Sequence, residues 1–116
     1  PPCRLSPLPP RRMTTAVVLY DLPPPPGLED CRDHFPKIAP SLLEIPGFLR
    51  KHFICSSDSK VAGGVYLWKT EEDAQRFYRG PWLDGVRARY GSEPRVSYFE
   101  TVALADKATV YAGALA

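Results

Sequence analysis

The sequence is poor in cysteine and in net charge, and each shortage narrows the class of protein. Among 116 residues there are three cysteines, Cys3, Cys31 and Cys55, which lie far apart and form no CxxC pair. An odd and dispersed set of cysteines does not build a disulfide framework. We therefore expect a reducing compartment, with the cytoplasm as the default location.

Nucleic acid and membrane partners are also disfavoured. The formal net charge is only +2, and the basic residues are too dispersed to form a nucleic-acid surface. No apolar run approaches the ~20 residues that a membrane-spanning helix needs. The first twelve residues carry charge but no apolar centre, which does not fit a secretory signal. We expect no nucleic acid and no membrane partner.

Common catalytic and cofactor-binding patterns are missing as well. No glycine-rich loop joins a strand to a helix, so nucleotide binding is unsupported. Two histidines, His34 and His52, and three scattered cysteines give no metal-ligand spacing. No GxSxG motif marks a nucleophile. The expectation is no cofactor and no metal, although haem, for which one histidine suffices as ligand, stays open.

The chain divides into three parts. Residues 1–12 hold five prolines and three arginines, which predicts an extended, disordered arm, and Met13 is a plausible true start. Residues 13–105 form one domain, long enough to bury a core without metals or disulfides. Residues 106–116 are a mildly apolar tail that hangs free or lies on a partner.

A hairpin organises the predicted sheet. Its strands are Phe48–Cys55 and Val61–Lys69, joined by a polar turn. The returning strand contains Val65-Tyr66-Leu67-Trp68, which is apolar on both faces, and such a run indicates that both faces of the sheet are covered. Thr14–Leu22 and Arg95–Ala105 are the other two predicted strands.

Apolar residues spaced by three or four predict the helices. The first spans residues 28–45 and contains Pro36 and Pro40, so we expect a two-part helix that restarts near Pro36. The second starts after Thr70, which begins a capping-box pattern. A short third segment runs from Pro81 to Gly91, residues typical of a helix start and a helix end.

These elements follow the order βαββαβ, the ferredoxin-like arrangement. In this α+β fold both helices cover one face of a four-stranded antiparallel sheet. The other face is left bare although its residues are apolar. A second copy related by a two-fold axis is the simplest cover. We therefore predict a homodimeric α+β barrel.

Three stretches resemble a known family. They are Pro46-Gly47-Phe48 with Lys51, Ala62-Gly63-Gly64-Val65-Tyr66-Leu67-Trp68, and Glu71-Glu72 with Ala74. The chain resembles, from about residue 14 to 104, the small monooxygenases of the dimeric α+β barrel superfamily, relatives of the antibiotic-biosynthesis monooxygenases. The resemblance implies a homodimer and, in the best-understood members, oxygenation of aromatic compounds by O2 without flavin, haem or metal. Pro36, Pro40 and the arm depart from the family pattern.

Aromatic residues predict a pocket between sheet and helices. Pockets for flat organic ligands are mostly apolar with a few orienting polar groups. Gly63 and Gly64 leave space beside the strand there. The alternative for each ring is simple core packing. The predicted pocket residues are Tyr20, Phe48, Arg50, Tyr66, Trp68, Phe77, Trp82 and Tyr98.

His52 is the predicted catalytic base. Imidazole exchanges protons near neutral pH, and strand alternation places His52 on one face with Phe48, Arg50 and Ile54. Arg50 would hold an anionic substrate if that face lines the pocket. Lys51 falls on the opposite face, where a solvated charge is the ordinary interpretation; for His52 the ordinary one is a solvent-edge or interface histidine.

The leading hypothesis is a homodimeric, cofactor-independent monooxygenase that oxidises a small aromatic or polycyclic compound. The competing hypotheses are a non-catalytic module that binds a hydrophobic ligand or serves for dimerisation, and a haem-binding relative. The enzyme and the non-catalytic module both need the cavity. Turnover, measured as oxygen consumption with hydroxylated aromatics, separates these two hypotheses.

Overall fold

The computed structural model describes residues 12–24, 27–107 and 110–112. The predicted arm lies outside this part of the chain, apart from Arg12. The elements in chain order are β1 (Thr14–Asp21), α1 (Gly27–Ile38), the 3-10 helix η1 (Ala39–Glu44), β2 (Phe48–Cys55), β3 (Val61–Trp68), α2 (Glu71–Arg79), α3 (Pro81–Tyr90), β4 (Arg95–Glu100), β5 (Ala103–Ala105) and β6 (Val110–Ala112).

Four strands form one antiparallel sheet in the order β2-β3-β1-β4. β2 and β3 form a hairpin, whereas helices connect β1 to β2 and β3 to β4. These connections and the strand order are those of a ferredoxin-like fold. The predicted ferredoxin-like α+β fold of the single chain is therefore confirmed. In the sheet's register Val17 of β1 lies opposite Val65 of β3 and Ser97 of β4.

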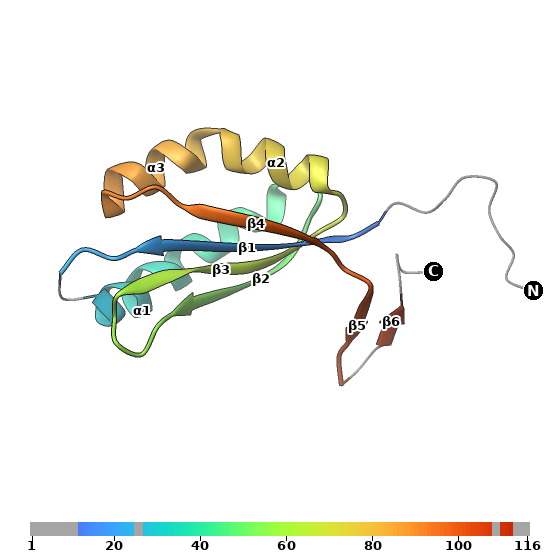
Figure 1. Ribbon diagram of the computed structural model, residues 1–116, viewed down its shortest axis with the longest axis horizontal. Helices are drawn as coiled ribbons and strands as arrows, with labels where there is room; N and C mark the ends of the chain where they lie inside the picture. The colour runs from blue at the N-terminus through green and yellow to red at the C-terminus, as the bar shows by residue number, and fades with distance from the viewer. Residues whose placement is uncertain (1–11, 25–26, 108–109, 113–116) are drawn as a thin grey trace, which may run out of the picture.

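The helices gather on one side of this sheet (Figure 1). α1 packs against β2, and α2 packs against β1 and β3. We call the side that they cover the helix face and the other side the open face. Alternate residues of the central strands point to the helix face and build the core, which comprises Ala16, Val18, Tyr20, Cys31, Phe35, Ala62, Tyr66, Trp68, Ala74, Tyr78, Val86 and Tyr90.

The first helical segment breaks at Pro40, so the predicted restart near Pro36 is wrong. α1 runs through Pro36, which is exposed and lies only two residues before the helix ends at Ile38. Pro40 instead falls in the first turn of η1. At that position the missing N–H has no helical acceptor to lose. The second proline, not the first, divides the segment.

The predicted boundaries of the next two helices are confirmed. The Thr70 hydroxyl oxygen accepts a hydrogen bond from the Asp73 backbone N–H at 3.1 Å and so caps the start of α2. Pro81 opens α3, and Gly91 closes it with a left-handed φ of 67°.

The last predicted strand is interrupted. β4 ends at Glu100, where the Thr101 N–H still donates to the Met13 carbonyl at 2.9 Å. The chain then leaves the sheet, and β5 pairs with β6 in a separate hairpin that projects from the end of the sheet in Figure 1. The predicted single strand Arg95–Ala105 is therefore wrong beyond Glu100.

Candidate functional site

A cavity lies between the helices and the sheet. It consists of two adjoining hollows of about 350 Å³ and about 220 Å³, which share Ile38, Lys51 and Trp82. We call their union the inner cavity. Its lining residues are Tyr20, His34, Ile38, Ser41, Leu42, Ile45, Lys51, Tyr66, Phe77, Pro81, Trp82, Gly85, Val86, Arg89 and Tyr90.

Aromatic rings make up much of this lining. The Phe77 and Trp82 rings lie 5.9 Å apart, and Tyr66 lies 6.2 Å from Phe77. At the other end Tyr20 and Tyr90 stack with centroids 4.4 Å apart. Burial raises the pKa of Tyr66, and a side-chain hydrogen bond with Trp82 offsets this only in part. The tyrosine hydroxyl therefore stays protonated and can donate a hydrogen bond inside the cavity.

Lys51 brings an amine into this aromatic lining. Its Nζ atom lies 3.8 Å from the centre of the Phe53 ring and 4.4 Å from that of Tyr66. Such contacts stabilise a cation, but they do not replace the hydrogen bonds of water. Burial accordingly lowers the pKa of Lys51 to about 7.

The two glycines of β3 are needed for different steric reasons. A Cβ atom on Gly64 would lie 2.4 Å from Cε of Lys51, so the missing side chain makes room for the lysine. A Cβ atom on Gly63 would lie 1.8 Å from the carbonyl oxygen of Val18 on the neighbouring strand. The predicted space is therefore found at Gly64, where Lys51 occupies it, whereas Gly63 permits close approach of two backbones.

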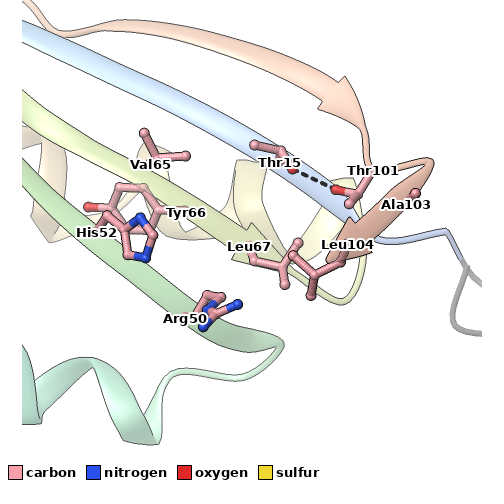
Figure 2. Close-up of a pocket in the computed structure, with 9 residues that line it drawn as sticks. All are labelled: Thr15, Arg50, His52, Val65, Tyr66, Leu67, Thr101, Ala103 and Leu104. Carbon is pink, nitrogen blue, oxygen red and sulfur yellow. Dashed lines mark hydrogen bonds between the residues drawn. The ribbon is translucent and has the colours of Figure 1, made fainter. Parts of the chain in front are cut away.

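A second pocket, of about 170 Å³, lies on the open face (Figure 2). Arg50 and His52 of β2 line it, together with Leu67 and Leu104. Leu104 of β5 lies beside Leu67 in Figure 2, and Leu67 is only 7% exposed. We call this the outer pocket, lined by Thr15, Arg50, His52, Val65, Tyr66, Leu67, Thr101, Ala103 and Leu104.

The outer pocket is more polar on its β2 side. Arg50 is exposed and forms an ion pair with Asp106 at 3.3 Å, and His52 is exposed as well. At its other end the hydroxyls of Thr15 and Thr101 lie 2.6 Å apart in a hydrogen bond. Exposed ion pairs of this kind hold a charge weakly, because water screens them.

The structure divides the predicted site residues into three groups. Tyr20, Tyr66, Phe77 and Trp82 line the inner cavity. Trp68, Phe48 and Tyr98 pack in or against the core, where Trp68 is fully buried and donates its indole N–H to the Tyr78 hydroxyl at 3.1 Å. Arg50 and His52 line the outer pocket. The rings and the proposed base are therefore on opposite faces of the sheet.

The predicted grouping of Phe48 with Arg50 and His52 is wrong. Phe48 lies opposite Trp68, and their rings meet edge to face at 5.8 Å on the helix face. A shift of register between Phe48 and Arg50 causes the difference. A β-bulge adds one residue and so reverses which face the following residues occupy relative to those before it.

Lys51 is the residue whose environment the sequence interpretation missed. It shares its face with Phe53, as alternation predicted, but that face turns toward the helices. One signal was available: Phe53 lies opposite Gly64, the residue without a side chain. An apolar neighbour and a missing side chain on the adjacent strand are compatible with a buried lysine stem.

The fold and the cavity define a class: a ferredoxin-like α+β protein with an aromatic cavity between its sheet and helices. A family model described as "Putative mono-oxygenase ydhR" matches residues 23–93, which is more than half of the chain. The chain belongs to this ydhR mono-oxygenase family, and the predicted family resemblance is confirmed. No curated protein sequence matches the chain significantly.

Solved structures show the same fold. SnoaB, a cofactor-independent oxygenase from Streptomyces nogalater, is 18% identical, with a TM-score of 0.56 over 76% of this chain and 91% of its own. The ActVA-Orf6 monooxygenase of Streptomyces coelicolor, solved with nanaomycin D, is 18% identical, with a TM-score of 0.59 over 78% and 88%. A haem-degrading protein of Mycobacterium tuberculosis is also 18% identical, with a TM-score of 0.53 over 82% and 98%.

Two further observations concern metals and membranes. In the described part of the chain no three His, Cys, Asp or Glu side chains gather as metal ligands would. No helix within these residues has the length and apolar character needed to cross a membrane.

Proposed function

We propose that this protein is a cofactor-independent monooxygenase that oxidises a small aromatic or polycyclic compound with O2 in the inner cavity. The observation that carries the proposal is the aromatic lining of that cavity in a member of a mono-oxygenase family. The names of two similar structures, a cofactor-independent oxygenase and a monooxygenase bound to nanaomycin D, support it.

The reaction balances without a further reductant when the substrate is a phenol or an activated ring carbon. The substrate loses two hydrogen atoms and gains one oxygen atom, and the second oxygen atom leaves as water. A phenol would give a quinone in this way. The protein must then supply a base that deprotonates the substrate, an apolar site that excludes water, and a donor to the reduced oxygen.

The inner cavity offers two of these three. Phe77 and Trp82, whose rings contact each other, would pack against the ring of the substrate, and the Tyr66 hydroxyl would donate to the reduced oxygen. His52 remains the sequence-based candidate for the base. It lines the outer pocket beside Arg50, across the sheet from the inner cavity, so a base for a substrate in that cavity has to come from the cavity's own lining.

The homodimer and its cytoplasmic location belong to the same proposal. The open face carries half-buried Val17, Leu19 and Val65, and the ring of Phe99 on it is 55% exposed. The β5 segment covers only the end of this face at Leu67. A second copy would cover the rest, as in an apolar interface between identical chains.

Oxygen consumption tests the proposal. The full chain is mixed with a panel of hydroxylated mono- and polycyclic aromatics, and O2 uptake is followed with matched product analysis by mass spectrometry. The expected product is heavier by one oxygen and lighter by two hydrogens. Quenching of tryptophan fluorescence without O2 uptake would favour the non-catalytic binding module, and tight binding of added haem would favour the haem-binding alternative.

A further inference from the structure

The side chain of Lys51 packs against one glycine and two aromatic rings and faces the inner cavity. Its stem passes over Gly64, and its Nζ atom lies above the rings of Phe53 and Tyr66. Lys51 is also one of the three residues common to both hollows of the inner cavity. The Lys51 side chain therefore lines both hollows of the inner cavity.

The amine has no polar partner there. Among residues 12–24, 27–107 and 110–112, every ion pair of a basic side chain involves an arginine, and no hydrogen bond reaches Lys51 Nζ. A partly buried ammonium ion without a carboxylate partner loses solvation that contacts with aromatic rings replace only in part. Burial lowers the pKa of Lys51 to about 7, so near neutral pH the amine is poised between its neutral and its charged form.

No neighbouring group supplies a negative charge. The titratable side chains of the inner cavity are, besides Lys51, the His34 imidazole from α1, the Arg89 guanidinium and Tyr90 hydroxyl from α3, and the Tyr20 and Tyr66 hydroxyls from β1 and β3. Burial raises the pKa of all three tyrosines, which keeps them neutral, and lowers the pKa of His34. Arg89 is already paired with Asp30 at 3.0 Å.

We propose that Lys51 accepts the acidic proton of the substrate in the inner cavity and then holds the resulting anion as its ammonium partner. An N–H bond forms at Nζ, and an O–H or acidic C–H bond of the substrate breaks. No electron is gained or lost in this step, so no oxidant is required. The proton transfer to Lys51 does not depend on the proposed function. Only the later reaction of the substrate anion with O2 rests on it.

Transfer inside the cavity avoids a large cost. If the substrate enters as a neutral molecule and meets a neutral amine, neither group has to lose the hydration shell of an ion. The ion pair then forms where the low dielectric strengthens the attraction of its two charges. The site should therefore select flat aromatic compounds with a phenolic or enolic proton over analogues in which that proton is replaced by a methyl group.

The probe for this inference is 4-nitrophenol, whose anion is yellow and whose neutral form is nearly colourless. It is titrated with the full chain at pH 6, and the absorbance of the bound probe reports its protonation state. The wild-type protein should bind it as the yellow anion. Lys51→Met, which keeps the stem and removes the amine, should weaken binding of the anion by roughly tenfold or more, the value of a lost hydrogen bond to a charged group.

One further variant separates the role of the charge from that of proton transfer, and a second serves as the control. Lys51→Arg keeps a cation that cannot give up its proton; at pH 8 the wild-type protein should take up a proton on binding the probe, whereas this variant should not. Lys60→Met removes an exposed lysine in the hairpin turn and should match the wild type. Thermal unfolding of each variant confirms that it is folded.

The outcomes are distinct. A colourless or absent complex with the wild-type protein, or a yellow complex of equal affinity with Lys51→Met, overturns the inference. A yellow complex that depends on Lys51, in a protein that consumes no O2 with any phenol, supports the inference and refutes the proposed function.

Discussion

The two faces of β2 place neighbouring basic residues in opposite environments. Lys51 points to the helix face, where aromatic rings surround it and no carboxylate in the described chain pairs with it. Arg50 and His52 point to the open face, where both are exposed and Arg50 has Asp106 as a partner. Residue type alone would favour histidine as the base, but the same reaction can use lysine once burial has lowered its pKa.

The comparison also explains why the rings and the predicted base do not meet. The sheet separates them, because successive residues of a strand point to opposite sides. Phe77, Trp82 and Lys51 line the same hollow, so a substrate packed on these rings would lie on the same side of the sheet as the amine. The same substrate could contact His52 only from the other side of the sheet.

The largest expected effect is on catalysis, and it tests the two faces against each other. With a phenol that the oxygen assay identifies as substrate, Lys51→Met should lower kcat/KM by roughly 10²–10⁴-fold, the usual contribution of a general base. The loss should exceed that of His52→Ala by at least about tenfold. A larger loss in His52→Ala would move the chemistry to the outer pocket.

The next effect concerns the pH dependence of stability. The folded-state pKa of Lys51 is about 7, below its ordinary value of 10.5, so between these values the unfolded chain binds more protons than the folded one. The free energy of unfolding should therefore rise with pH across this window, by up to about 1.4 kcal/mol per unit.

Lys51→Met removes this contribution. The variant should be more stable than the wild type at pH 6, and its advantage should shrink as the pH rises from about 7 to 10. Urea unfolding at a series of pH values, with Lys60→Met as the matched control, measures the difference. A constant difference between variant and wild type would show that Lys51 titrates normally.

The open face should behave as an interface. Phe99→Glu replaces a ring that is 55% exposed in the single chain by a carboxylate, so the folding of the single chain should change little. Burial of that charge between two copies is costly. We expect a dimer weakened by roughly hundredfold in sedimentation analysis. Leu43→Glu, at a position that is 75% exposed on η1, is the control. A wild-type chain that sediments as a monomer at micromolar concentration would remove the interface.

The two glycines of β3 should differ in how well they tolerate a side chain. Gly63→Ala drives a methyl group against the Val18 carbonyl and should cost about 2 kcal/mol or more of unfolding free energy. Gly64→Ala meets the flexible end of Lys51 instead, so it should cost less and displace the amine. Denaturant melts rank the two. If Gly64→Ala costs as much as Gly63→Ala, the lysine is not free to move aside.

The smallest effect belongs to the exposed ion pair. Arg50→Ala removes the contact with Asp106 and should change stability by less than about 1 kcal/mol, since both side chains are solvent-accessible. Urea unfolding at low and high salt measures it. A cost of several kcal/mol would mean that the outer pocket is more enclosed than the open face described above.

The fold could be predicted because its signals are local and repeated. The apolar run of β3, the cap at Thr70 and the Pro81 to Gly91 segment each specify one element, and the order of elements then allows few topologies. The β2–β3 hairpin begins and ends within one residue of its predicted bounds.

The wrong predictions lie where a single residue changes which face of the sheet the following side chains occupy, or where it ends a helix. The irregularity between Phe48 and Arg50 separated two residues that strict alternation would have placed together. Pro36 was tolerated near a helix end, whereas Pro40 marked the change to a 3-10 turn. Alternation placed Lys51 opposite His52 correctly, but which side turns toward the helices depends on packing between distant segments, and a strand pattern does not contain that information.

The most direct test of the account is the titration of the Lys51 side chain itself. In the full chain with ¹⁵N-labelled lysine, NMR follows each Nζ resonance with pH, and Lys51→Met assigns the signal. We predict a midpoint near 7 in the ligand-free protein, which rises when a non-oxidisable acidic phenol binds. A midpoint near 10.5, the value of an ordinary lysine, would contradict this proposal, because the amine would then be a solvated cation and not a base within the inner cavity.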